Sequence, residues 1–230
     1  MNVQIFLAGD VMTGRGIDQV LAHPSNPKLY EPHVRDARSY VALAEVTNGT
    51  VPAPVQPDYI WGDALRVLDK AQPTLRIVNL ETAVTTSDAA WTSKGIHYRM
   101  NPANIDCLTA AQLDACVLAN NHVLDWGHQG LRETLSHLHQ AGLKTAGAGD
   151  DLQAAIAPAV LPVSPSHRVL LFAWGTSSSG IPPAWSAGAQ RAGVALLTDL
   201  SHAMAQRLAE HIVAQRRAGD LVIVSLHWGE

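Results

Sequence analysis

Short apolar runs and longer amphipathic segments follow one another along the whole chain. The apolar runs predict β-strands at residues 3–8, 75–78, 96–99, 115–119, 144–146, 160–163, 168–174 and 221–226. Helical spacing of apolar residues, or a capping residue, predicts helices at residues 17–22, 39–45, 61–71, 101–112, 129–141, 151–156 and 201–217. Strands that alternate with helices are typical of α/β proteins. At 230 residues the chain suits one large domain spanning residues 1–230, with two small domains as the alternative.

Two long segments lack this regular pattern. Residues 23–58 contain six prolines, and residues 175–193 are rich in Ser, Gly and Pro. A loop as long as the first is usually functional in a compact domain, so we expect it to form one wall of a substrate cleft. The second has neither the lysine nor the spacing of a phosphate-binding P-loop.

Polar residues with metal-binding chemistry follow four of the predicted strands, at the point where each strand ends. They are Gly9-Asp10, Asn79-Leu80-Glu81, Asn120-Asn121-His122 and His227. Open α/β sheets bind ligands at the carboxyl ends of their strands, so we expect these groups to meet. Divalent ions prefer carboxylate and amide oxygens together with neutral imidazole nitrogens. The sequence therefore predicts a metal site formed by Asp10, Glu81, Asn121 and His227.

His122 directly follows one of these predicted ligands in the sequence. A histidine beside a metal is well placed to protonate a leaving group or to stabilise a developing charge. Each motif is weak evidence by itself, because Gly-Asp fills ordinary turns and Asn or Glu caps many helices. Their recurrence at four strand ends favours a functional site.

Composition narrows the class of protein. The formal net charge is -4 and no Lys/Arg-rich run occurs, which argues against a nucleic-acid partner. No apolar run approaches the roughly 20 residues that a membrane span requires, and no signal peptide precedes the first strand. We therefore expect a cytoplasmic protein. Cys107 and Cys116 have neither zinc-site nor disulfide spacing, which predicts two reduced, half-buried thiols.

Five motifs together resemble one known family. They are Gly9-Asp10-Val11-Met12-Thr13-Gly14-Arg15, Asn79-Leu80-Glu81, the stretch from Ala119 to Gly127 (ANNHVLDWG), Gly147-Ala148-Gly149 and Ser225-Leu226-His227-Trp228-Gly229. This series is similar to that of the CapA family of capsule poly-γ-glutamate synthesis proteins. The family resembles calcineurin-like metallophosphoesterases, which have an α/β/β/α sandwich fold and a two-metal centre.

The resemblance implies roles for individual residues. Asp10, Glu81, Asn121 and His227 would be ligands of two divalent ions (Mn, Fe or Zn), and His122 and Asn120 would be catalytic. Arg15, Lys94 and Arg99 match basic positions of the family and would meet an anionic small-molecule or polymer substrate.

Two departures from the family pattern bear on these roles. Typical metallophosphoesterases have a histidine two residues after the first Asp, whereas this chain has Met12, as CapA-like proteins do. The family also continues beyond the His-Trp-Gly-Glu motif, at which this sequence stops. The resemblance thus predicts a fold and a metal site that are incomplete at the C-terminus. It also predicts an exposed sheet edge at residues 221–226, through which the chain could self-associate.

Two functional classes follow. The first is a metal-dependent hydrolase linked to poly-γ-glutamate capsule synthesis or processing, acting on a phosphoester or a γ-glutamyl amide bond. The alternative is a non-catalytic, anion-binding component of a polymer synthesis or export complex. The presence or absence of turnover separates these two classes.

Overall fold

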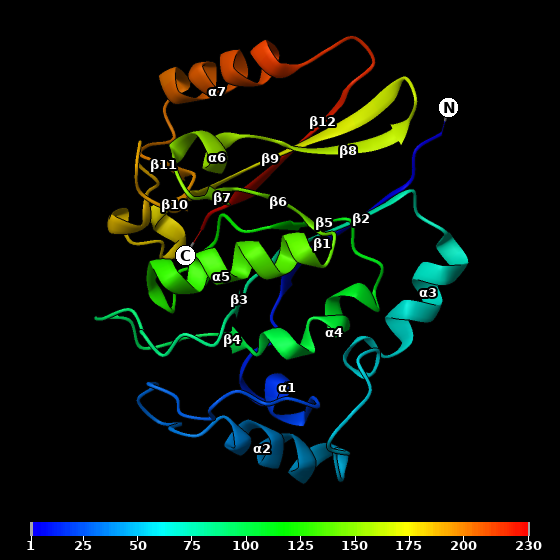
Figure 1. Ribbon diagram of the computed structural model, residues 1–230, viewed down its shortest axis with the longest axis vertical. Helices are drawn as coiled ribbons and strands as arrows, with labels where there is room; N and C mark the ends of the chain where they lie inside the picture. The colour runs from blue at the N-terminus through cyan, green and yellow to red at the C-terminus, as the bar shows by residue number, and fades with distance from the viewer. Residues whose placement is uncertain (1, 230) are drawn as a thin grey trace. The chain divides into compact units, whose positions relative to one another are not determined.

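The chain folds into two compact units, each made of discontinuous segments (Figure 1). The computed structural model describes residues 2–229. Unit 1 comprises Met1–Asp114 and His122–Leu143, and unit 2 comprises Ala115–Asn121 and Lys144–Glu230. Organisation as a single domain over residues 1–230 stays a prediction.

Unit 1 is built around a parallel strand pair. Strand β1 (Ile5–Val11) pairs with β2 (Leu75–Leu80), and every residue of β2 is buried. The short strands β3 (Ala83–Val84) and β4 (Arg99–Met100) are also parallel. The helices are α1 (Arg15–Val20), α2 (Arg38–Asn48), η1 (Tyr59–Trp61), α3 (Asp63–Ala71), η2 (Pro102–Asn104), α4 (Asp106–Thr109) and α5 (Gly127–Gln140).

Unit 2 contains a mixed sheet in which β9 is central. Strand β9 (His167–Thr176) pairs in parallel with β12 (Leu221–His227) and β11 (Leu196–Leu197), and antiparallel with β8 (Ala159–Ser164). The remaining strands form two pairs: β5 (Ala115–Val117) with β6 (Lys144–Ala146), parallel, and β7 (Ala148–Gly149) with β10 (Gly193–Val194), antiparallel. The helices are α6 (Leu152–Ile156), η3 (Ser177–Ser179), η4 (Pro183–Trp185) and α7 (His202–Gln215).

The apolar stripe of α7 fixes that helix on the sheet of unit 2. Met204, Leu208 and Ile212 pack against a buried cluster that includes Phe172 and Trp174 of β9. This is the packing that the spacing of these residues predicts. Asp151 caps α6, as predicted, by accepting a hydrogen bond from the backbone N–H of Ala154 at 2.8 Å.

Most predicted elements are confirmed, and the differences have local causes. The first strand runs on to Val11, because a bulge between Ala8 and Asp10 lets the pairing with β2 continue. Gly62, with a φ of +51°, separates η1 from α3 within the helix predicted at residues 61–71. The helix predicted at residues 101–112 forms as η2 and α4 and ends before Gln112, whose φ is also +51°. The strand expected at residues 96–99 is β4, further along the chain.

The last strand has the exposed environment that the resemblance predicts. The apolar run by itself indicates a buried strand at residues 221–226, but Leu221, Val224 and Leu226 are 44–48% exposed. Within the described part of the chain, β12 pairs only with β9. An uninterrupted apolar run predicts a strand, but it does not report whether both faces of that strand are covered.

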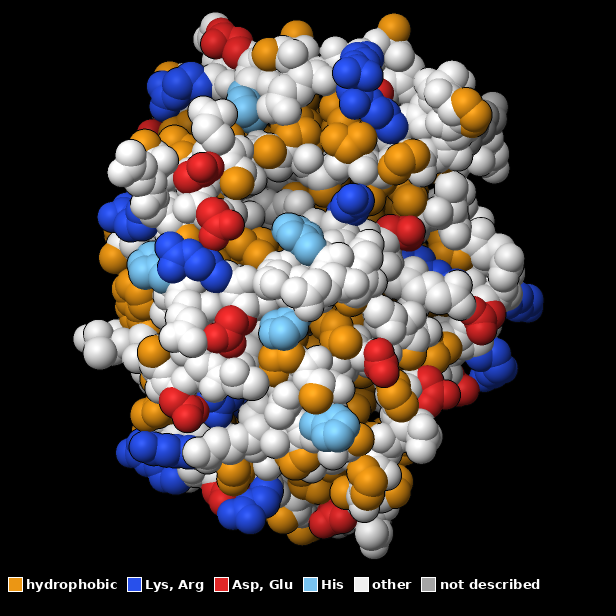
Figure 2. All heavy atoms as spheres, in the orientation of Figure 1, with side chains coloured by type: hydrophobic (Ala, Val, Ile, Leu, Met, Phe, Trp, Pro, Cys, Tyr) orange, Lys and Arg blue, Asp and Glu red, His pale blue; other side chains and the backbone are white. Residues whose placement is uncertain are grey.

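Charged side chains of both signs are interspersed over the face in view in Figure 2. Among residues 2–229, no helix combines the length and the apolarity that crossing a bilayer requires. Cys107 and Cys116 are free thiols, as predicted, but both are fully buried and not half-buried.

Candidate functional site

Two predicted ligands of unit 1, Asp10 and Glu81, lie together where β1 and β2 end. The bulge in β1 sets Asp10 opposite Asn79, whose Nδ2 donates a hydrogen bond to Asp10 Oδ1 at 2.6 Å. Glu81 follows β2, and its backbone N–H donates to the Val11 carbonyl at 3.0 Å. Burial raises the pKa of Glu81 to about 8, and a hydrogen bond and the negative charge of Asp10 act in the same direction. At neutral pH the Glu81 carboxyl is therefore largely protonated.

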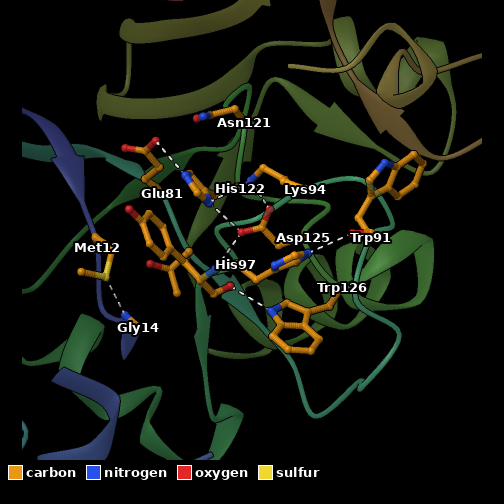
Figure 3. A network of polar contacts seen from close by, with 12 residues as sticks. Met12, Gly14, Glu81, Trp91, Lys94, His97, Asn121, His122, Asp125 and Trp126 are labelled. Atoms are coloured by element: carbon orange, nitrogen blue, oxygen red, sulfur yellow. Dashed lines mark hydrogen bonds and ion pairs between the residues drawn. The ribbon is translucent and has the colours of Figure 1, made fainter. Parts of the chain in front are cut away.

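His122 is held by a buried carboxylate on one side and faces Glu81 on the other (Figure 3). Its Nδ1 lies 2.6 Å from Oδ2 of Asp125, which is 0% exposed, and its Nε2 lies 3.7 Å from Glu81 Oε1. A carboxylate can only accept, so Nδ1 carries the proton and Nε2 is the basic nitrogen. Burial lowers the pKa of His122 despite the opposing effect of Asp125. The contact with Glu81 thus joins two neutral groups at pH 7.

Asp125 collects three donors at the centre of this arrangement. Besides His122, it accepts the backbone N–H of Tyr98 at 2.7 Å and forms an ion pair with Lys94. Lys94 Nζ also lies 3.1 Å from His122 Nδ1, and burial lowers the pKa of the lysine against the pull of Asp125. The Tyr98 ring stacks on His122 with centroids 3.8 Å apart and planes 18° apart. The hydrogen bond to Asp125 and the stacking on Tyr98 therefore fix the imidazole ring in place.

Asp125 is a functional residue that was not predicted from the sequence. The only signal for it is its spacing of three residues from His122, because a loop or turn can bring positions i and i+3 into contact. The partnership with Lys94 carries no such signal, since 31 residues separate Lys94 from Asp125. The structure thus places Lys94 against the histidine and its carboxylate, while its predicted contact with substrate stays a prediction.

The two predicted substrate arginines have different surroundings. Arg99 is 7% exposed, and its Nη1 donates to the Ser87 carbonyl and to Asp88 Oδ1, both at 2.7 Å. Arg15 is partly exposed, and its Nε donates to Glu31 Oε1 at 2.7 Å. Their roles toward a substrate stay predictions.

The other two predicted ligands, Asn121 and His227, contact each other within unit 2. His227 is the last residue of β12, and its Nε2 lies 3.2 Å from Asn121 Oδ1. Asn120, predicted to be catalytic, is fully buried. Asp10 and Glu81 thus lie together in unit 1, and Asn121 and His227 contact each other in unit 2. Convergence of all four in one centre stays a prediction.

The residues present suit a divalent cation in their chemistry. Asp10 and Glu81 are hard oxygen donors, and burial, assisted by the neighbouring Asp10, keeps the proton on Glu81 at neutral pH. A divalent cation bound by these residues would replace that proton. Within residues 2–229, however, no group of three or more His, Cys, Asp or Glu side chains is arranged to hold an ion. Met12 Sδ accepts a hydrogen bond from the Gly14 N–H at 3.1 Å and serves the local turn (Figure 3).

Fold and site together define the class of protein. Parallel strand pairs in a mixed α/β fold, with polar side chains at the strand ends, are those of a calcineurin-like α/β protein, which confirms the predicted fold class. The family model described as "Bacterial capsule synthesis protein PGA_cap" matches residues 4–230, and the chain belongs to this family. The resemblance drawn from the motifs is thereby confirmed.

Two curated relatives come from two strains of Mycobacterium tuberculosis. Each is named "Probable polyglutamine synthesis accessory protein" and is 44% identical to this chain over 228 residues. The match covers 99% of this chain and 60% of each relative. The chain therefore spans three-fifths of the length of these relatives.

Proposed function

We propose that the protein is a metal-dependent hydrolase that acts in the synthesis or processing of a poly-γ-glutamate capsule. Its substrate is an anionic small molecule or polymer, and the bond it cleaves is a phosphoester or a γ-glutamyl amide. Membership of the capsule synthesis family and the printed names of the relatives support the biological setting. The observation that carries the chemistry is His122, fixed by Asp125 with its basic nitrogen 3.7 Å from the Glu81 carboxyl group.

His122 is suited to move a proton at Nε2. Its lowered pKa keeps the ring neutral at pH 7, so that Nε2 can accept a proton from an attacking water. Asp125 stabilises the imidazolium that forms and holds the ring in the required tautomer. The proton is then available to the departing oxygen or nitrogen. Lys94 compensates the buried charge of Asp125.

Asp10 and Glu81, with Asn121 and His227, are the residues that would hold divalent metal, and Mn, Fe and Zn are the candidates. A bound metal would supply Lewis acidity and would lower the pKa of a water molecule toward 7. In this proposal Asn120 has its predicted role beside His122 in catalysis.

One observation favours the alternative of a non-catalytic, anion-binding component. Met12 stands at the position of a metal-ligating histidine in typical metallophosphoesterases, and its sulfur is engaged in the turn at Gly14. A site with fewer ligands could bind an anionic polymer without turnover.

The test compares metal content and turnover in the same preparations. His122→Ala should lower hydrolysis by about 10² to 10⁴-fold and leave metal content unchanged, because the residue carries a proton and binds no metal. His33→Ala, an exposed histidine of the same unit, is the control and should change neither. The panel should contain a phosphomonoester, a phosphodiester and a γ-glutamyl dipeptide. Parallel loss of metal and activity would make His122 a ligand, and wild-type protein that binds metal but cleaves nothing would favour the alternative.

A further inference from the structure

The backbone around Arg15 is held in a conformation that its residue type disfavours. Arg15 has a φ of +50°, in the left-handed region that favours glycine. Its neighbours are glycines at close contacts: a Cβ on Gly14 would lie 2.9 Å from Arg99 N, and one on Gly16 would lie 3.0 Å from Tyr40 Cβ. The backbone on both sides of Arg15 is therefore packed closely against other segments of unit 1. Strain of this kind is concentrated at binding and catalytic sites.

The Arg15 side chain is clamped between two aromatic rings. Its guanidinium carbon lies 4.8 Å from the ring centroids of both Tyr40 and Tyr98. Glu31, which is buried, accepts a hydrogen bond from Arg15 Nε and another from the Tyr40 hydroxyl. Among the described residues, neither terminal nitrogen of Arg15 has a hydrogen-bond partner. The side chain thus presents a prearranged pair of NH₂ groups, the geometry that binds carboxylate or phosphate through two oxygens.

An apolar cavity adjoins this arginine within unit 1. Its volume is about 400 Å³, and Arg15 is the only Lys or Arg among its lining residues. The apolar lining comes from α1, α2, η1 and the segments beside them, and includes Met12, Ile17, Val20, Val41, Ala44 and Ile60. Small-molecule sites typically have this size and this combination of apolar walls with few polar groups.

We propose that this cavity binds an oxyanion, either carboxylate or phosphate, that carries an apolar substituent. The terminal nitrogens of Arg15 bind the anion, and the apolar walls hold the substituent. Glu31 offsets the charge of Arg15, so recognition depends on the planar fork more than on bulk positive charge. This site deepens the proposed function, on which it rests for the role of Arg15 toward an anionic substrate, but binding at the site needs neither a metal nor turnover.

Calorimetric titration of the metal-free protein tests the proposal with two series of probes. One series runs from methyl phosphate to octyl phosphate, and the other runs from acetate to octanoate. The wild-type protein should bind longer chains more tightly, by about fourfold for each methylene that the cavity buries. The series with the higher affinity identifies the head group.

Three variants separate the head-group contact from the cavity. Arg15→Met should weaken both series by about 10- to 100-fold, and Arg15→Lys should weaken them nearly as much, because lysine keeps the charge but lacks the fork. Ala44→Phe should fill the cavity and remove the chain-length dependence of affinity, while the affinity for methyl phosphate stays the same. If the phenylalanine prevents folding, Ala44→Leu is used in its place. Arg66→Met, at an exposed ion pair on α3, is the matched control.

Three results would overturn the proposal: no binding of any probe to wild-type protein, unchanged affinity in Arg15→Met, or a chain-length dependence that survives in both Ala44 variants. Because no probe is hydrolysed in the measurement, failure of the proposed hydrolase activity would leave the result unaffected.

Discussion

Replacing Arg99 by methionine should destabilise unit 1 substantially, because this arginine joins three separate segments. Its guanidinium donates to the carbonyl groups of Ser87 and Asn26 and to the Asp88 carboxylate, and it lies 4.0 Å from the centroid of the Trp126 ring. Only 7% of the residue is exposed. Methionine matches much of the length of the side chain but removes every one of these polar contacts.

The magnitude follows from these contacts taken one at a time, leaving out the long 3.3 Å bond to the Asn26 carbonyl. The short bond to the Ser87 carbonyl has a charged donor and contributes about 1.5–3 kcal/mol. The stacking on Trp126 contributes about 1–2 kcal/mol in this desolvated setting. Asp88 is 77% exposed, so solvent screens its ion pair and we count it as about 0.5 kcal/mol. Relief from burying the charge offsets part of the total, which leaves an expected loss of about 2–4 kcal/mol.

Urea denaturation followed by tryptophan fluorescence measures this loss directly. Arg66→Met is the control, because Arg66 and Asp63 are 77% and 87% exposed, and this variant should change stability by less than about 0.5 kcal/mol. A loss below about 1 kcal/mol in Arg99→Met, accompanied by weaker substrate binding, would refute the structural role. Arg99 would then bind the substrate, as the family resemblance implies.

Three further predictions concern stability and reactivity. Burial raises the pKa values of Cys107 and Cys116 to about 12, so iodoacetamide at pH 8 should label neither thiol in the native protein. Both thiols should be labelled in urea, and labelling of the native protein would contradict their burial. Burial also raises the pKa of Asp18, so the contribution of this carboxyl group to stability should be present below about pH 3.8 and decline as pH rises through the pKa of the folded state. The free energy of unfolding, measured relative to Asp18→Asn, should therefore fall over that range. A rise would show that the hydrogen bonds of the Asp18 carboxylate outweigh its burial. Gly130→Ala should destabilise α5 by about 1–3 kcal/mol despite the better helix propensity of alanine, because the new Cβ would lie 2.7 Å from Trp126 Cβ. A higher melting temperature of the variant would show that the helix can shift to accommodate the methyl group.

The order of strands and helices could be predicted because the buried face of each element requires apolar residues at regular spacing in the sequence. The apolar stripe of α7 and the run of β9 each identify their element, since a single face or a whole strand is covered. The position of Asp10 could be predicted only approximately. The bulge that sets it opposite Asn79 has Gly9 as its sole local signal, and the extra residue depends on the pairing with β2.

Side-chain partners in the irregular segments could not be predicted, because no period links them. Lys94 lies in a stretch between β3 and β4 that has no helical or strand pattern, and it meets Asp125 only through the tertiary fold. The sequence pattern predicted His122, and the resemblance predicted Lys94 as a substrate-binding residue, but neither predicted that Asp125 contacts both. Those contacts decide which form of His122 is present and therefore which proton it can move.

The three basic residues that the resemblance groups together differ in the hydrogen bonds and ion pairs that their charged groups form. Lys94 is engaged with Asp125 and lies against His122, and Arg99 donates to backbone carbonyls beneath Trp126. Arg15 alone of these three keeps two terminal nitrogens without a hydrogen-bond partner among the described residues, and it lies beside a cavity. Loss of Arg99 should therefore appear first in stability and loss of Arg15 first in anion binding. Loss of Lys94 should appear first in the pH dependence of turnover, because its charge acts on the Asp125–His122 pair.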